Sequence, residues 1–170
     1  MHSVVRRLCV VMLLLSAGLL LAACGGSLAA LHPPAEEPIY GSLLSEKSLD
    51  KGKKYYRDGD YGLAEKAFRK AIEEDKDNAE AWLGLAASYD RLQRFDLADR
   101  AYKIVIKMTG NSPTVLNNLG YHYLLRGDYA NARVTLAAAQ KADPNNLFVK
   151  NNLALIDEGG VPPSHKPAGR

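Results

Sequence analysis

The 170-residue sequence has only two cysteines, both in its N-terminal apolar stretch, so no disulfide framework can hold a fold together. Lys and Arg number 22 against 19 Asp and Glu, which leaves no clustered positive field of the kind that nucleic acids select. No nucleophile with a base, paired acids, metal-ligand set or glycine-rich phosphate loop occurs, and His122 alone among the histidines falls in an expected helix, at its surface or between helices. We therefore expect no enzyme, no cofactor or metal site and no nucleic-acid partner.

The N-terminus has the profile of a signal peptide. Arg6 and Arg7 precede an apolar stretch from Leu8 to Ala23. As a helix with a rise of about 1.5 Å per residue, this stretch reaches roughly 24 Å, short of the ~30 Å hydrocarbon core of a bilayer. We predict that residues 1–23 form a signal peptide and not a membrane-spanning helix.

The stretch ends in Leu21-Ala22-Ala23-Cys24-Gly25, which resembles the bacterial lipobox. The resemblance implies cleavage before Cys24 and attachment of fatty acyl chains, such as palmitate, to its sulfur and amine. Two or three such chains would hold the protein at a membrane permanently. The glycines after Cys24 resemble the default signal for the outer membrane, so we expect a periplasm-facing lipoprotein. The alternatives are an ordinary secretory signal with an incidental cysteine and an uncleaved membrane helix.

Two segments have the composition of unstructured chain. Residues 24–44 contain Pro33, Pro34 and Pro38, which interrupt any helical period, and we predict the lipidated cysteine followed by a flexible linker. Residues 159–170 carry three further prolines and are predicted to be a disordered tail.

Between these segments the sequence repeats with a period of 34 residues. Three columns show it: Tyr55, Tyr89 and Tyr123; Ala64, Ala98 and Ala132; Tyr61, Phe95 and Tyr129. In the second unit Trp82, Leu85 and Tyr89 recur at spacings of three and four, which predicts a helix over residues 79–92 and a second helix after a turn at Gln93. Sharper turns are expected in the other units, with Asp60 and Asp128 capping the helices that follow. Small residues such as Gly120 and Ala132 would let the two helices of a unit approach closely.

The columns resemble the tetratricopeptide repeat. The matching residues are Trp82, Leu85, Ala86, Tyr89, Ala98 and Tyr102 in the second unit, and Leu119, Gly120, Tyr123, Ala132, Ala139 and Pro144 in the third. The resemblance implies an all-α, right-handed α-solenoid with hairpins at 45–78, 79–112 and 113–146 and a C-terminal capping helix at 147–158. Ser48 and Lys51 replace apolar residues of the family pattern and are expected on the solvated flank of the first repeat. In the capping helix, Lys150 and Asp157 replace Leu116 and Tyr123 of the preceding unit, which predicts a solvated outer face.

In such solenoids the first helix of each unit lines a concave surface, which we expect to bind a peptide segment. The candidate groove residues are Leu49, Lys53, Tyr56, Glu80, Leu83, Ala87, Asp90, Asn117, Asn118, Tyr121, Leu124 and Asn151. Asparagine amides can donate to and accept from an extended main chain, and tyrosines offer flat apolar area. The alternative is that these asparagines only cap or solvate helices and the tyrosines only pack between repeats. The two-carboxylate clamp of the family is not reproduced, because Lys53 and Arg57 are the only basic pair on this face.

The layout of lipobox, linker and repeats, with the runs 117–121 and 125–130, resembles the tight-adherence (Flp) pilus assembly lipoproteins. The resemblance implies a membrane-anchored scaffold or pilotin that helps a Flp-type pilus or a related secretion apparatus to assemble. An adaptor or regulator of cell-wall synthesis or hydrolysis enzymes is the alternative. A cytosolic, membrane-tethered chaperone is a third possibility, which acylation of Cys24 would exclude because that processing takes place outside the inner membrane.

Overall fold

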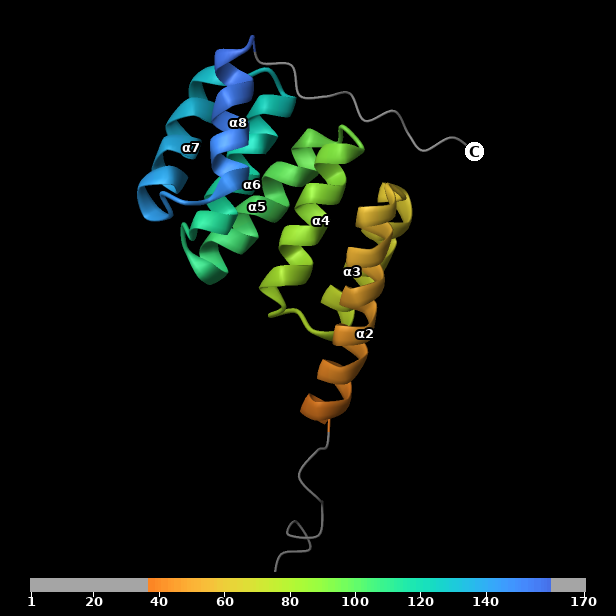
Figure 1. Ribbon diagram of the computed structural model, residues 1–170. Helices are drawn as coiled ribbons and strands as arrows, with labels where there is room; N and C mark the ends of the chain where they lie inside the picture. Colours follow the sequence, from red (N-terminus) through yellow and green to blue (C-terminus); the bar gives the residue numbers. More distant parts are fainter. Residues whose placement is uncertain (1–36, 160–170) are drawn as a thin grey trace, which may run out of the picture. The chain divides into compact units, whose positions relative to one another are not determined.

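A computed structural model describes residues 37–159, and these residues form seven α-helices and no strand (Figure 1). The helices are α2 (Glu37–Asp58), α3 (Tyr61–Glu74), α4 (Ala79–Arg91), α5 (Phe95–Thr109), α6 (Pro113–Leu125), α7 (Tyr129–Ala142) and α8 (Leu147–Asp157). The predicted signal peptide, Cys24 and the tail from residue 160 lie outside the described residues. None of the described helices is both long enough and apolar enough to span a membrane.

The first helix begins earlier than the composition predicts. Residues 37–44, expected to belong to the linker, are part of α2. Pro38 is the second residue of this helix, where a backbone N–H has no intrahelical acceptor, so the missing donor costs nothing. A proline therefore stands at a helix start here and not in a linker, and residues 24–36 remain the predicted linker.

Successive helices pack as three hairpins, α2 with α3, α4 with α5 and α6 with α7, and α8 packs on the last (Figure 1). The alanine column of the repeat, Ala64, Ala98 and Ala132, has no exposed surface. At Gly120 of α6, a Cβ atom would lie 2.5 Å from Cγ of Leu136 in α7, closer than two carbon atoms can pack. The expected close approach of paired helices is therefore confirmed for this hairpin.

The buried side chains form two apolar clusters along the solenoid. The first joins α2, α3, α4 and α5 and includes Phe68, Leu85 and Tyr89, with Leu119 of α6 packed against it. The second lies within α6, α7 and α8 and includes Leu124, Leu136 and Val149. The second and third repeats thus meet where one cluster ends and the other begins.

The turn inside each hairpin has the same geometry at the same place in the repeat. Gly59, Gln93 and Gly127 are 34 residues apart and have φ angles of 84°, 58° and 75°. Glycine adopts this left-handed conformation freely, whereas a side chain makes it costly. Gln93 therefore holds a strained conformation in the one hairpin turn that lacks glycine.

Helix caps follow the sequence predictions only in part. The Asp128 side chain accepts hydrogen bonds from the side-chain amide of Asn131 (2.6 Å) and, as expected of a cap, from its backbone N–H (3.1 Å). These two bonds hold the pKa of Asp128 below its ordinary value. Asp60 makes no side-chain cap bond, so that prediction is wrong. Asn78 caps α4 through Ala81 (2.9 Å) and also donates to the buried Ser45 hydroxyl (3.1 Å). This bond ties the start of the second repeat to α2.

The polar residues at the two ends of the solenoid behave differently. Lys150 and Asp157 of α8 are exposed, as expected for a capping helix, and Asp157 pairs with Arg133 of α7 (2.8 Å). In the first repeat Lys51 is exposed, but Ser48 is only 6% exposed, so its predicted place on a solvated flank is wrong. A serine is small enough to be covered where α2 packs against its neighbours.

Candidate functional site

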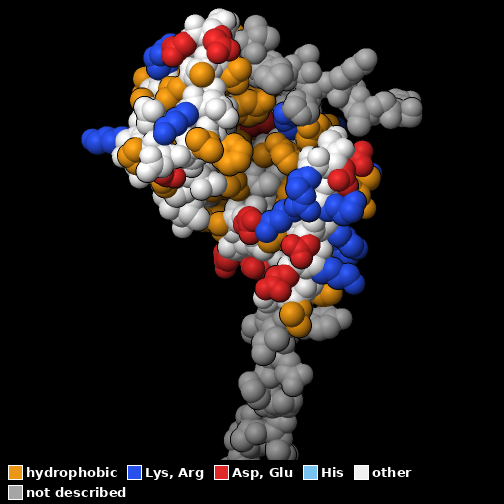
Figure 2. Space-filling view, in the orientation of Figure 1, with side chains coloured by type: hydrophobic (Ala, Val, Ile, Leu, Met, Phe, Trp, Pro, Cys, Tyr) orange, Lys and Arg blue, Asp and Glu red, His pale blue; other side chains and the backbone are white. Residues whose placement is uncertain are grey.

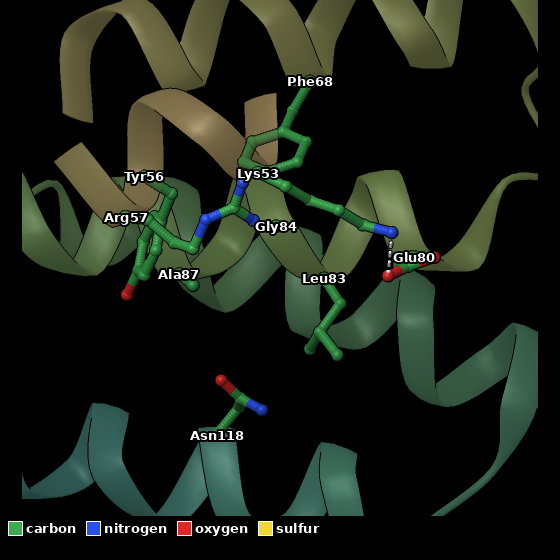
Figure 3. A pocket seen from close by; sticks show the side chains of 9 residues that line it. All are labelled: Lys53, Tyr56, Arg57, Phe68, Glu80, Leu83, Gly84, Ala87 and Asn118. Atoms are coloured by element: carbon green, nitrogen blue, oxygen red, sulfur yellow. Dashed lines mark ion pairs between the residues drawn. The ribbon is translucent and has the colours of Figure 1, made fainter. Parts of the chain in front are cut away.

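A groove of about 290 Å³ crosses the first helices of the three repeats (Figure 3). Its walls come from α2, α3, α4 and α6. The lining residues are Lys53, Tyr56, Arg57, Phe68, Glu80, Leu83, Gly84, Ala87 and Asn118. Because it is built by side chains from all three repeats, its shape depends on how the hairpins stack.

The floor of the groove is apolar and depends on a glycine. The ring of Phe68, which comes from α3, lies so close beneath Gly84 that a Cβ there would be 2.5 Å from a ring carbon. Leu83 and Ala87 of α4 complete this surface. Figure 2 shows hydrophobic side chains gathered in the middle of one face of the molecule, with lysine and arginine side chains beside them. The hollow therefore suits an apolar side chain of a ligand.

Charged groups stand at the rim. Lys53 Nζ and a carboxylate oxygen of Glu80 are 2.6 Å apart across the groove, as the dashed line in Figure 3 shows. Both side chains are partly exposed, so this pair can exchange partners at little cost. Arg57 is exposed and makes no ion pair with another described residue. The rim thus offers a cation to a ligand.

Aromatic rings and one arginine connect the repeats at one end of the groove. Tyr56 packs edge-on against Tyr61 with ring centres 5.3 Å apart. The guanidinium carbon of Arg91 lies 4.7 Å from the centre of the Tyr61 ring, and its Nη1 donates to the Tyr121 hydroxyl at 3.4 Å. Burial raises the pKa of Tyr56 to about 12, so this phenol remains neutral and able to donate a hydrogen bond at ordinary pH.

The structure brings only some of the predicted groove residues together. Lys53, Tyr56, Leu83, Ala87 and Asn118 line the same groove, with Glu80 beside them. The other predicted residues that remain accessible lie beyond it: Asn117, which accepts a hydrogen bond from Asn152 (3.0 Å), Tyr121, which pairs with Arg91, and Asn151, which is exposed on α8. Tyr56 and Leu83, which were expected to form one strip with Tyr121, both line the groove, but the lining residue from α6 is Asn118 and not Tyr121.

Three predictions of groove residues are wrong because the side chains are buried. Leu49 is 7% exposed within the first apolar cluster, and Leu124 is 1% exposed within the second. Asp90 is 3% exposed, and its carboxylate accepts from the Tyr102 hydroxyl (2.8 Å) and contacts a ring nitrogen of His122. Burial raises the pKa of Asp90, although the hydrogen bonds from His122 and Tyr102 oppose that rise.

Phe68 and Gly84 line the groove although the sequence reasoning did not place them there. Phe68 is a buried residue of α3, and its ring lines the groove because it fills the space under Gly84. A signal for Gly84 was available in the period, because Gly84 and Asn118 are 34 residues apart and Asn118 was a candidate.

Comparisons with known proteins agree on the repeat. Two tetratricopeptide-repeat family models match, one at residues 55–115 and one at residues 86–146. No curated protein is similar enough in sequence to count as a match.

Solved structures give the same fold. The complex of the TPR2B domain of yeast Sti1 with pHsp70 has a TM-score of 0.61 and 22% identity, and the match covers 69% of this chain and 98% of that one. The type III secretion translocator chaperone SycD of Yersinia enterocolitica has a TM-score of 0.60 and 24% identity, with coverage of 69% and 94%. Pseudomonas aeruginosa pilF has a TM-score of 0.61 and 26% identity, but the match covers only 54% of that chain against 69% of this one. The hairpins, their 34-residue period and these matches show that the folded region is an all-α solenoid of tetratricopeptide repeats.

Proposed function

We propose that this protein is a non-catalytic scaffold that binds an extended peptide segment of a partner protein in the groove along α2, α4 and α6. The observation that carries the proposal is the groove itself, which has an apolar floor and polar groups at its rim. The Sti1 structure, a complex of a tetratricopeptide-repeat domain with pHsp70, supports peptide binding by this fold.

The lining residues define the ligand that fits. A large apolar side chain of the peptide would enter between Tyr56 and Leu83 and rest on the Phe68 ring. Asn118 donates to the Thr114 carbonyl (2.8 Å), which orients its amide and leaves its oxygen able to accept a main-chain N–H. Arg57 would attract an acidic group next to the apolar one.

We further propose that the scaffold is held in the cell envelope by lipid on Cys24, at the outer membrane facing the periplasm, and assists assembly of a Flp-type pilus or a related secretion apparatus. The lipobox resemblance supports the anchor, and the resemblance to Flp pilus assembly lipoproteins supports the role. Similarity to Pseudomonas aeruginosa pilF over 69% of the chain is consistent with this assignment.

Two substitutions, one inside the groove and one outside it, test the binding surface. Leu83→Asp places a charge in the groove, whereas Val134→Asp places the same charge on α7, at a side chain that is already 71% exposed. Affinity capture from envelope preparations is expected to recover pilus or secretion components with the wild type and Val134→Asp, and to lose them with Leu83→Asp. Equal recovery by all three would contradict groove binding, and recovery of cell-wall enzymes in place of pilus components would favour the alternative role.

The anchor is tested separately. Cys24→Ser is expected to abolish incorporation of labelled palmitate and to release the protein from the membrane fraction. A wild-type protein that incorporates no label would overturn the anchor without affecting the groove.

A further inference from the structure

The second and third repeats meet at a buried polar cluster and not at a purely apolar surface. His122 of α6 has no exposed surface, and both of its ring nitrogens face carboxylates. Its Nδ1 lies 2.5 Å from Asp90 Oδ1 of α4, and its Nε2 lies 3.1 Å from Asp99 Oδ1 of α5. These contacts join three helices from two repeats at the place where the two apolar clusters meet.

The other groups that face the ring complete this cluster. Arg126, which follows α6, donates to Asp99 Oδ2 (2.9 Å) and lies 3.4 Å from His122 Nε2. The Tyr102 hydroxyl of α5 donates to Asp90 and also approaches the Asn118 carbonyl (3.4 Å). The imidazole is otherwise surrounded by aromatic rings, namely Phe95, Tyr102 and Tyr123 at centre-to-centre distances of 6.0, 5.3 and 5.5 Å.

The number of protons in the cluster decides whether these contacts are favourable. A neutral imidazole has one N–H and one lone pair, so it can donate to only one of the two carboxylates. An imidazolium donates to both, and its charge together with that of Arg126 balances Asp90 and Asp99. Loss of that proton would leave a net negative charge where Asp90 and His122 have almost no contact with water, which is costly.

We propose that the junction between the second and third repeats is a proton-dependent joint, in which the Asp90–His122–Asp99 cluster closes the junction by retaining a proton that the separated repeats would release. Asn118, which lines the groove, belongs to α6, so opening of this joint would also move the α6 side of the groove. The joint itself goes beyond the proposed function and does not require it.

The stability of the folded state should decrease as pH rises, because folding is linked to retention of a proton. Burial raises the pKa of Asp90, and a group that holds its proton more tightly in the folded state stabilises that state at low pH and loses this contribution as pH rises. Below about pH 4 the ordinary protonation of carboxylates reverses the trend.

An upper bound can be given for the fall of the folding equilibrium constant with rising pH. If the unfolded chain has an ordinary histidine pKa of about 6.5 and the cluster keeps its proton, the folding equilibrium constant falls about 25-fold between pH 6 and pH 8. Partial loss of the proton in the folded state makes the fall smaller.

Urea unfolding of wild type, His122→Gln and Asp157→Asn at these two pH values tests the proposal. Asp157 belongs to an exposed ion pair far from the joint in sequence, and Asp157→Asn serves as the control for removing an ionisable side chain outside the joint. We expect the folding equilibrium constant of the wild type and of the control to fall between pH 6 and pH 8 as described above. In His122→Gln we expect this constant to change by less than about threefold. A wild type without the effect, or a His122→Gln variant that retains it, would overturn the proposal.

A second measurement covers the case in which His122→Gln does not fold. NMR of ¹⁵N-labelled wild-type protein distinguishes imidazolium from neutral imidazole through the ring-nitrogen shifts. We expect an imidazolium, or a proton shared with Asp90, for His122 at pH 7.5, and an ordinary neutral ring there would refute the joint. Neither measurement uses a groove ligand, so failure of the proposed function and failure of the joint are distinguishable.

Discussion

Alanine at Gly120 and alanine at Gly62 should change the free energy of unfolding in opposite directions. Alanine favours a helix interior over glycine by about 1 kcal/mol. At Gly120, however, the new Cβ would lie 2.5 Å from Leu136 Cγ and 2.6 Å from Cδ2, and Leu136 has no exposed surface into which it could turn. Overpacking of this kind costs about 1–3 kcal/mol, and contacts at the branch point of a buried leucine belong at the upper end. The expected net result for Gly120→Ala is destabilisation by roughly 1–2 kcal/mol.

The control separates packing from helix propensity. At Gly62, near the start of α3, a Cβ would meet no other group within 4 Å, so Gly62→Ala is expected to stabilise the protein by up to about 1 kcal/mol. Urea denaturation followed by circular dichroism measures both variants. A neutral or stabilising Gly120→Ala would refute the reasoning, because it would mean that α6 and α7 have room to spare and that the small column does not set their spacing.

Three further predictions concern the turns, a cap and the groove. Gln93→Gly should stabilise the protein by about 0.5–1 kcal/mol, because it removes left-handed strain of about 1–2 kcal/mol at the entropic cost of a glycine, and a lower urea midpoint would count against this. Asn78→Ala should destabilise it by about 1–2 kcal/mol, because the helix cap and the bond to Ser45 are both lost; Asn78→Asp, which retains the cap oxygen, should lose less. Burial raises the pKa of Tyr56 to about 12, so the folded protein holds the phenol proton more tightly than the unfolded chain does. The stabilisation that this gives is complete below about pH 10. As pH rises from about 10 to about 12, the free energy of unfolding should fall by about 2 kcal/mol. Tyr56→Phe should therefore unfold less steeply with alkaline pH than the wild type, and identical alkaline profiles would exclude this role.

The sequence predicts the architecture well because the 34-residue period constrains it at many positions together. The helix over residues 79–92 is found at Ala79–Arg91, and the capping helix predicted at 147–158 is found at Leu147–Asp157. The start of α2 was missed, because a proline in the first turn of a helix and a proline in a linker look alike in sequence.

The candidate site was predicted less completely. Helical spacing indicates the side of a helix to which Leu83, Ala87 and Asp90 point, but it does not indicate how closely the next repeat covers each of them. Leu83 and Ala87 remain accessible in the groove, whereas Asp90 lies beneath α5 and α6 in contact with Tyr102 and His122. Burial of a charged group becomes visible only when its partners, which lie 12 and 32 residues away, are placed in space.

Site-specific photo-crosslinking in living cells tests the central claim, that partners bind on the groove face. A photoreactive amino acid at Ala87 lies in the groove, and the same group at Val134 lies on α7 outside it. The account predicts a crosslinked partner from Ala87 and none from Val134, with the Ala87 product lost when Leu83→Asp is added. Crosslinks from Val134 alone would contradict it.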